Sequence, residues 1–533
     1  MPFLRRFRVI TALLVALAVA AAFLDYRDLV SSGLKRAVGA AQFGPSLIAF
    51  AGGTALSFAC VGVLVLTALV GRVYCSTICP LGLLQDAIAR VAALVRKLLK
   101  IKKKRLPFRR PDHVLRQGIL VVTVLCVVAG WGGFAMAWLD PYSHFGRVAG
   151  ALFRPPVLFI NNTATTVLEW VGRGAWVPRV PVPWAGIGAF LPPLIIFGVV
   201  AIVSALRGRL YCNAICPVGT LLGWASRRAL FRLAIDKTAC GRCGDCTGVC
   251  KAQCIDLRAQ TVDFSRCVAC FNCVAVCDKA AIRLAFRGRA KARGAVPLRA
   301  PRPVAAQPVL TRREFVAGAG GVAALAGGFA LLGGGHFASA AASNSVTAPP
   351  GALSRKRFIE RCTACQLCVS TCPSHVLAPA LSHYGTPAGF MKPYMNYTDS
   401  FCNINCTVCM DVCPDGALVR LPLAEKQVSR LGLAEVTIER CIVRASDTAC
   451  GACAEHCPTA ALQFVKGKRT YDEPKVNKDL CIGCGACEFA CPALPVKAII
   501  IRGFEKHEKA VEMEQEKAED PNADKTSAGE FPF

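Results

Sequence analysis

The chain has 533 residues, is 54% hydrophobic, contains 31 cysteines and carries a formal net charge of +29. This length exceeds that of one compact domain, and an odd number of cysteines in regular Cys-x-x-Cys spacings excludes a secreted disulfide framework. The basic residues cluster beside apolar runs and in one linker rather than among aromatic side chains. We therefore attribute the charge to membrane topology and expect no nucleic-acid partner.

Residues 1–235 are predicted to form a helical membrane domain. Four apolar runs cover residues 9–24, 47–70, 114–138 and 187–206. Most of them reach the roughly 20 residues with which a helix spans a bilayer. No convincing cleavage site follows the first run, so we expect an uncleaved anchor rather than a signal peptide.

The orientation of this domain follows from its basic residues. The loop 71–113 contains eleven Lys and Arg residues, whereas the longer loop 139–186 contains four. The positive-inside rule therefore places the first loop in the cytoplasm, together with the N-terminus and the chain that follows the fourth run. The lipid bilayer expected around the helices is the inner (plasma) membrane of a bacterium.

A repeated phrase closes the second and fourth runs. It reads GRVYCSTICPLGLL from Gly71 to Leu84 and GRLYCNAICPVGTL from Gly208 to Leu221. Its two cysteines are four residues apart, which places both thiols on one helix face, and the next Pro breaks the helix. Both copies end on the same membrane side, so the pairs can meet. An additional iron–sulfur centre, a redox-active dithiol pair and structural cysteines beside a tight turn all remain open for Cys75, Cys79, Cys212 and Cys216.

The loop between the third and fourth runs begins with WLDPYSHFGR, Trp138 to Arg147. Oxidation of a quinol needs a proton acceptor near the membrane interface, and a carboxylate or an imidazole can serve. The alternative is an interfacial anchor with a proline turn, because Trp and Tyr prefer that depth. The candidate quinol-site residues are Asp140, Tyr142, His144 and Arg147.

Residues 236–286 contain two Cys-x2-Cys-x2-Cys-x3-Cys runs, which are typical of a bacterial two-cluster ferredoxin. The fourth cysteine of each run is expected to serve the other [4Fe–4S] cluster. One predicted ligand set is Cys240, Cys243, Cys246 and Cys277, and the other is Cys267, Cys270, Cys273 and Cys250. The Pro that usually follows the fourth cysteine is replaced by Lys251 and Asp278. Cys254, Cys60 and Cys126 are left over.

Residues 287–310 are rich in Arg, Ala and Pro and are predicted to be a basic linker. Residues 311–345 begin with Thr-Arg-Arg-Glu-Phe, which resembles a twin-arginine export signal, and Ala340 closes a candidate cleavage site. A cluster-bearing domain must cross a membrane already folded, so we expect export of the domain that follows. A Gly/Ala-rich linker or a fifth membrane helix is the alternative.

Residues 355–503 carry four more cysteine groups, each ending in Cys-Pro, and residues 504–533 read as a charged tail. Sixteen thiols predict four [4Fe–4S] clusters, hence about six in the chain. The groups are Cys362, Cys365, Cys368 and Cys372; Cys402, Cys406, Cys409 and Cys413; Cys441, Cys450, Cys453 and Cys457; and Cys481, Cys484, Cys487 and Cys491. The chain contains no Cys-x-x-Cys-His, so no haem is expected.

With these motifs, residues 1–286 resemble the NapH-type (MauN-like) ferredoxin subunit of membrane quinol dehydrogenases. Residues 311–503 resemble the NapG-type (MauM-like) four-cluster ferredoxin subunit, here fused to the first. The resemblance implies an electron-transfer component that oxidises membrane quinol and delivers electrons to a periplasmic acceptor protein. Likeness to other four-cluster subunits implies pairing of the outer and of the inner cysteine groups, with sequential pairing left open.

The expected fold is therefore an α-helical membrane bundle of four spans, or five, with α+β ferredoxin-like [4Fe–4S] domains. Two other functions stay open beside quinol oxidation. One is an accessory redox protein that reduces metal centres or thiols while a respiratory enzyme matures, although the extra domain such proteins usually carry is not found. The other is a redox sensor whose clusters control a partner.

Overall fold

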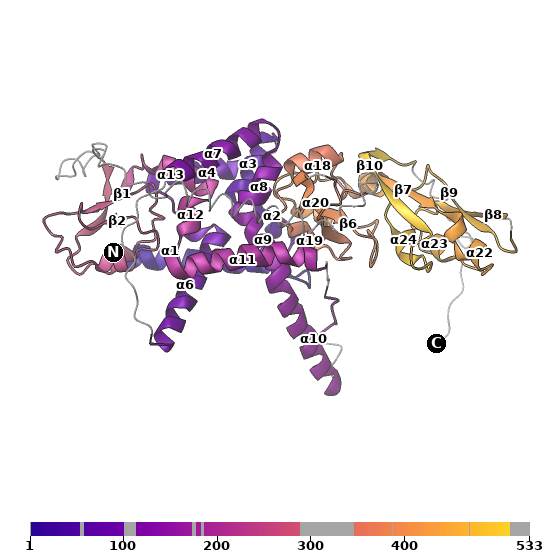
Figure 1. Cartoon of the computed structure of the whole chain (residues 1–533), viewed down its shortest axis with the longest axis horizontal. Coiled ribbons are helices and arrows are strands. Elements are labelled where there is room, and N and C mark those ends of the chain that lie inside the picture. Colours follow the sequence, from indigo (N-terminus) through magenta and orange to yellow (C-terminus); the bar gives the residue numbers. More distant parts are fainter. Residues whose placement is uncertain are drawn as a thin grey trace, which may run out of the picture.

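The computed structural model describes residues 2–53, 58–100, 113–172, 177–182, 186–287, 346–385, 387–467 and 469–511. It is elongated, with helices in the middle and one small strand-containing unit at each end (Figure 1). Most of the linker predicted over residues 287–310, the twin-arginine motif and Ala340 lie outside the described residues.

The central part consists of helices that vary widely in length. In chain order they are α1 (Pro2–Leu24), α2 (Ser32–Ala40), α3 (Phe43–Ala51), α4 (Phe58–Val70), α5 (Tyr74–Thr77), α6 (Pro80–Leu98), α7 (His113–Val128), α8 (Gly132–Leu139), α9 (Pro141–Val148), the π-helical segment η2 (Ala149–Phe153), α10 (Arg154–Trp170), α11 (Ile187–Arg207), α12 (Leu210–Ala214) and α13 (Pro217–Ser226). In Figure 1, α6 and α10 project from the same side of this part.

The predicted bundle of four spans is not confirmed. In the described part, two helices are long and apolar enough to cross a membrane, over Phe3–Leu24 and Ile187–Arg207. The run 47–70 contains the end of α3, followed by Gly53 at φ 71°, and the run 114–138 is divided by Gly130 at φ 82°. Glycine adopts this left-handed conformation easily and ends helices there. Hydropathy alone therefore overestimated the length of continuous helix in these two runs.

The segment 139–186, predicted to be an outer loop, is largely helical in the part described. Asp140 begins α9, because its carboxylate accepts a hydrogen bond from the Ser143 amide at 2.8 Å and Pro141 occupies the first turn. The helix continues through η2 into α10, which carries two prolines at its start.

The first ferredoxin unit is closed by two antiparallel strand pairs, which extend it at the N-terminal side beyond the predicted boundary at 236. Its elements are β1 (Phe231–Ile235), α14 (Asp245–Gly248), β2 (Ile255–Asp256), β3 (Thr261–Val262), α15 (Asn272–Ala275) and β4 (Ile282–Phe286). Strand β1 pairs with β4, and β2 pairs with β3.

The second ferredoxin unit occupies residues 346–511, apart from residues 386 and 468. Its helical segments are α18 (Arg355–Arg361), α19 (Leu367–Thr371), η5 (Pro387–Gly389), α20 (Val408–Val412), α21 (Leu423–Gln427), η6 (Ile438–Arg440), α22 (Ile442–Ala445), α23 (Ala452–Glu455) and α24 (Ala486–Ala490). Its strand pairs are β5 (Leu377–Pro379) with β6 (Pro393–Met395), β7 (Ser429–Val436) with β10 (Ile499–Lys509), and β8 (Leu462–Val465) with β9 (Glu473–Val476). Since β10 continues to Lys509, the predicted tail boundary at 504 is too early.

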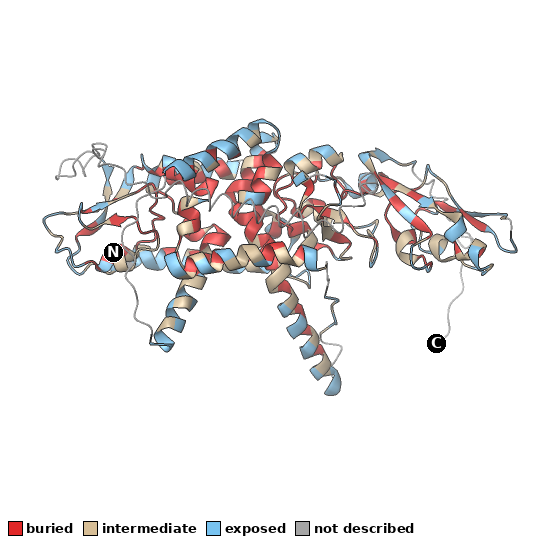
Figure 2. Ribbon diagram, viewed as in Figure 1, coloured by how far each residue is buried: buried red, intermediate tan, exposed pale blue. Residues whose placement is uncertain are grey.

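Helix α1 reaches from one ferredoxin unit to the other. Leu4, near its start, packs against the core of the first unit, whereas Val19, Ala22 and Phe23, near its end, belong to the core of the second. The Phe23 ring lies 5.7 Å from that of Tyr142, and burying such a ring contributes roughly 1.5–3 kcal/mol. Figure 2 shows the buried residues continuing from the helices into the units at both ends.

Candidate iron–sulfur sites

The cysteines of the first ferredoxin unit gather in the two predicted sets. Cys250, Cys267, Cys270 and Cys273 line one pocket, together with the leftover Cys254. In the other set, burial raises the pKa of Cys246, and the charges of Cys243, Cys240 and Cys277 raise it further. The fourth cysteine of each run thus lies beside the first three cysteines of the other run.

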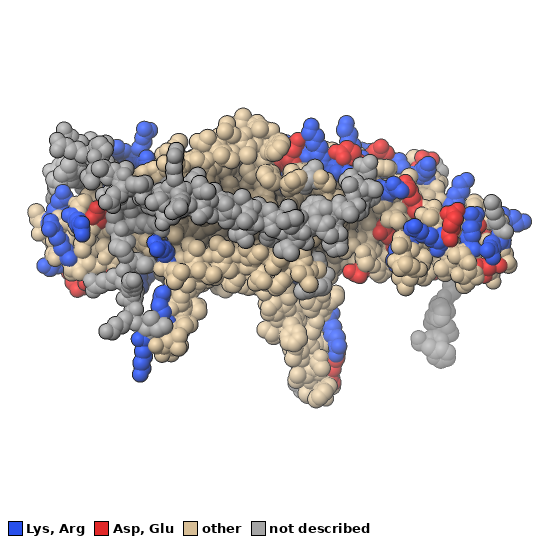
Figure 3. Space-filling model, viewed as in Figure 1, with Lys and Arg blue, Asp and Glu red and all other residues tan. Residues whose placement is uncertain are grey.

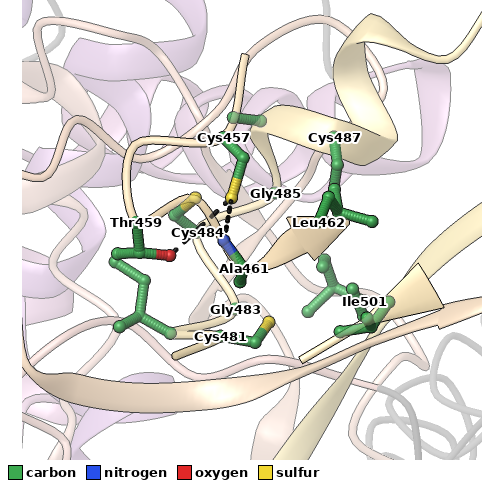
Figure 4. A pocket seen from close by; sticks show the side chains of 14 residues that line it. Cys457, Thr459, Ala461, Leu462, Cys481, Gly483, Cys484, Gly485, Cys487 and Ile501 are labelled. Atoms are coloured by element: carbon green, nitrogen blue, oxygen red, sulfur yellow. Dashed lines mark hydrogen bonds between the residues drawn. The ribbon is translucent and has the colours of Figure 1, made fainter. Parts of the chain in front are cut away.

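The last two cysteine groups of the chain also exchange one cysteine. Cys457, from the third group, lines a pocket with Cys481, Cys484 and Cys487 of the fourth (Figure 4). Reciprocally, burial raises the pKa of Cys453 to about 11, with further contributions from Cys450, Cys441 and Cys491. These eight thiols form two sets of four.

The first two groups of the second unit follow the same rule. Burial raises the pKa of Cys409, and the charges of Cys402, Cys372 and Cys406 add to that effect. Burial likewise raises the pKa of Cys368, and there the neighbouring charges include those of Cys365 and Cys362. Cys413 completes the latter set, because the charge of Cys368 is among those that act on it.

The cysteine groups therefore pair sequentially, one with two and three with four, and the pairing of outer and inner groups was wrong. The physical reason lies in the chain between the second and third groups. It forms α21 and then β7, which pairs with β10 at the end of the unit. Groups three and four lie in the chain between these two paired strands, so the strand pair joins them into one half and leaves groups one and two to the other.

These thiol sets fit iron–sulfur clusters in the number and kind of their ligands, because each set supplies the four thiols that a [4Fe–4S] cluster needs. Backbone amides also point at the sulfurs: Ala364, Leu418 and Ala461 donate to Cys362, Cys413 and Cys457 at 3.3–3.4 Å. Such donors stabilise thiolate charge.

The four cysteines of the repeated phrase also come together. Cys75, Cys79, Cys212 and Cys216 are all buried in one cluster of side chains that includes Cys270 of the first ferredoxin unit. Two arginines of the same phrase flank them. Arg72 lies 3.7 Å from the Cys75 sulfur and 3.2 Å from the Cys212 carbonyl oxygen, and Arg209 donates to the Cys75 carbonyl oxygen.

The quinol-site candidates lie on α9 and are all buried, between the repeated phrase and the second ferredoxin unit. His144 lies 6.1 Å from the Tyr211 ring, which directly precedes Cys212, and 3.4 Å from an Arg147 nitrogen. The second unit is just as close, because a Cβ on Gly146 would collide with the Cys365 carbonyl. Two buried oxygens, Asp140 Oδ1 and the Tyr142 hydroxyl, have no hydrogen-bond partner among the described residues.

Sequence reasoning missed the polar residues that hold these sites together. Asp86 is the clearest case, since its carboxylate binds Arg209 at 2.8 Å and Lys251 at 2.7 Å and thereby joins α6 to the first ferredoxin unit. For Arg72 and Arg209, the repetition of Gly-Arg before both cysteine pairs was the available signal. Nothing comparable marked Asp86.

Comparisons with known proteins match two parts of the chain. A family model described as a 4Fe-4S binding domain matches residues 51–103 and 189–237, which contain the two copies of the repeated phrase and none of the six four-cysteine groups. A second, described as a 4Fe-4S dicluster domain, matches residues 361–417 and 448–494, and these segments separate the same halves as the sequential pairing. No solved structure matches the chain.

Three curated relatives are ferredoxin-type proteins. The chain is 34% identical to NapG of Escherichia coli (strain K12) over 175 residues, which cover 30% of this chain and 73% of NapG. It is 31% identical to the methylamine utilization protein MauM of Methylobacillus flagellatus, over 28% of this chain and 64% of MauM. It is 26% identical to NapF of Escherichia coli (strain K12), over 30% of this chain and 86% of NapF.

The NapG- and MauM-like part of the predicted resemblance is thereby confirmed, along with several [4Fe–4S] binding regions. The NapH-like part stays a prediction. With 73% of NapG covered at this identity, the chain belongs to the NapG family of ferredoxin-type iron–sulfur electron-transfer proteins.

Proposed function

We propose that this chain carries electrons from membrane quinol through its iron–sulfur clusters to a periplasmic acceptor protein. One observation carries the proposal: the two helices long and apolar enough to cross a membrane both run from one ferredoxin unit to the other. At the far end of α11, Arg209 donates its amide to the Lys251 carbonyl at 3.1 Å. At the near end, a Cβ on Gly188 would meet Leu381 of the second unit.

The surface of the helical part supports a place in the bilayer. Large apolar side chains are exposed on α1, α4, α7 and α11, among them Phe7, Val65, Leu125 and Ile202. So many exposed large apolar side chains are unfavourable in water. On the face drawn in Figure 3, Lys, Arg, Asp and Glu gather at both ends of the molecule and on the two helices that project from its middle.

The proposed orientation of the chain in the membrane follows from the distribution of its basic residues. The first ferredoxin unit and the loop with eleven Lys and Arg residues face the cytoplasm. The second unit, which follows the twin-arginine motif, then faces the periplasm, at the other end of α1 and α11. The domain divisions at 1–235, 236–286 and 287–310 are part of the same proposal, with the shifted boundaries given above.

In this function the sets of four thiols described above hold six [4Fe–4S] clusters, and the clusters supply single-electron transfer when bound. The protein contributes burial and amide donors around the sulfurs, which set the reduction potentials. The proposal includes no haem, since the sequence contains no Cys-x-x-Cys-His.

The same proposal places the quinol site at α9. Burial raises the pKa of Asp140 to about 6, against the hydrogen bonds from Ser143 and the charge of Arg147, which lower it. A carboxylate with this pKa can take up a proton near neutral pH. Burial also lowers the pKa of His144 to about 3, so the imidazole is neutral and able to accept a hydrogen bond. The unpartnered Asp140 and Tyr142 oxygens are the groups that a quinol hydroxyl would meet.

Two measurements test the proposal. A quinol analogue added to reconstituted, cluster-loaded full-length protein is expected to reduce the clusters, as followed by electron paramagnetic resonance. Clusters that stay oxidised with every quinol tried, yet accept electrons from a soluble donor, would refute quinol oxidation. Reporter fusions after Phe286 and after Val511 are expected to report opposite membrane sides, and two cytoplasmic reports would refute the orientation.

A further inference from the structure

We propose that Cys75, Cys79, Cys212 and Cys216 together hold one further iron–sulfur cluster, which the two repeats share. Beyond the six clusters of the ferredoxin units, this centre would lie within the helical part. It does not depend on quinol oxidation, because its presence is read from iron content and spectra.

A buried cation lies beside the four thiols. Arg72 is fully buried, and its guanidinium donates to Asn213 Oδ1 at 2.9 Å, to the Ser265 carbonyl at 3.2 Å and to the Cys212 carbonyl at 3.2 Å. No carboxylate of the described residues lies within ion-pair distance of it. A buried cation without a counter-ion is costly, so an anion is expected beside Arg72.

The sulfurs are the groups that can supply this anion, since the Cys75 sulfur lies 3.7 Å from Arg72 Nη2. A disulfide or a pair of neutral thiols would leave the guanidinium uncompensated. Four thiolates around a [4Fe–4S] cluster in its oxidised state carry a net charge of about −2. The geometry therefore favours a thiolate-ligated cluster over the dithiol and over purely structural cysteines.

Two helix N-termini add to the positive potential. Cys79 and Cys216 are the N-cap residues of α6 and α13, and each precedes a proline in the first turn. The Cys216 sulfur accepts a hydrogen bond from the Gly219 amide at 3.3 Å. The positive end of a helix and its free amides stabilise a thiolate at this position.

The repeats are also built to share one centre rather than to hold two. Each contributes two cysteines, whereas a cubane cluster needs four protein ligands. The arginines cross between the copies: Arg72 of the first donates to the Cys212 carbonyl, and Arg209 of the second donates to the Cys75 carbonyl. The two cysteine pairs are thereby held against each other.

The position of the centre fits electron transfer between the two ferredoxin units. On one side, Val268 and Cys270 of the first unit pack into the same side-chain cluster as the four cysteines. On the other side, the Tyr211 ring contacts His144 of α9, and α9 packs against the second unit. A cluster here would lie between the clusters of the cytoplasmic ferredoxin unit and those of the periplasmic one.

The experiment measures iron and protein-bound sulfide in cluster-loaded full-length protein. Cys75→Ser and Cys212→Ser are each expected to lower the iron content by about four atoms per chain, and the double variant by no more than either alone. Cys126→Ser, a partly exposed cysteine of the same helical part, is the matched control and should leave iron unchanged. A normal content of the other clusters in the spectra would show that the variants still fold.

A second variant tests the role of Arg72 without touching a ligand. Arg72→Gln should keep the iron content but lower the reduction potential of this one centre, because a positive charge beside an anionic cluster favours its reduction. Three results would overturn the proposal: iron content unaffected by both serine variants, zinc in place of iron at this site, or a Cys75–Cys79 or Cys212–Cys216 disulfide found by mass spectrometry in protein isolated without reductant.

Discussion

Replacing Asp86 by Asn should weaken the contact between the first ferredoxin unit and the helices more than a substitution on the surface does. The Asp86 side chain is only 6% exposed, and its Oδ2 lies 2.8 Å from Arg209, 2.7 Å from Lys251 and 3.7 Å from Arg8. At an effective dielectric constant of about 20, each such contact is worth roughly 4 kcal/mol before the desolvation of the ions is subtracted. Removing one partner of a buried pair costs about 3–5 kcal/mol, and we expect this loss in the free energy of unfolding.

The assay is guanidinium unfolding of the detergent-solubilised protein, followed by far-ultraviolet circular dichroism. Glu169→Gln is the matched control, because it breaks an exposed pair with Arg179 at 2.6 Å and should cost far less than Asp86→Asn. The pH dependence gives a second check. Despite burial, the arginine and lysine charges hold the pKa of Asp86 far below the usual range of an aspartate, so its contribution is complete above about pH 5 and is lost only in strong acid. A loss no larger than that of the control, or one that changes between about pH 6 and pH 8, would refute the reasoning.

Three further outcomes are expected. Gly219→Ala should destabilise the protein by about 1–3 kcal/mol, because the added Cβ would collide with the Cys212 carbonyl. Gly118→Ala has open space around it in α7 and should stabilise the protein by about 0.5–1 kcal/mol. Thermal unfolding compares the two variants. Cys372→Ser should change the electron paramagnetic resonance signal of the cluster at Cys402, Cys406 and Cys409, whereas pairing of the outer groups would move the change to the fourth group. The rate of quinol oxidation should rise with pH through about 6, because Asp140 is protonated below that pH and cannot accept a proton, and Asp140→Asn should remove this rise in the pH profile.

The sequence was sufficient wherever a few neighbouring residues decide the structure. The spacing of the cysteines predicted both thiol sets of the first ferredoxin unit, because the exchange of fourth cysteines follows from two short loops packed together. The same local rule would have paired the later groups in sequence. The prediction failed there because it followed a likeness to other subunits, whereas β7 and β10 decide which loops are neighbours.

Other features depend on residues too far apart for any local pattern. The carboxylate of Asp86 meets Arg209 and Lys251, which lie 123 and 165 residues later in the chain. The helical breaks at Gly53 and Gly130 depend on backbone conformation, and an average of hydropathy over a window hides single glycines. For α9, the sequence identified the polar residues but could not show that the second ferredoxin unit covers them.

The crossed arginines also bear on the order in which the molecule is made. The partners Arg72 and Cys212 are 140 residues apart, and Cys75 and Arg209 are 134 residues apart. During synthesis the first repeat must therefore wait, with its guanidinium and thiols unsatisfied, until the second has left the ribosome and packed against it. The two copies can therefore pack against each other only late in synthesis, once the helical part is nearly complete. A cofactor held by all four cysteines can bind stably only after this packing.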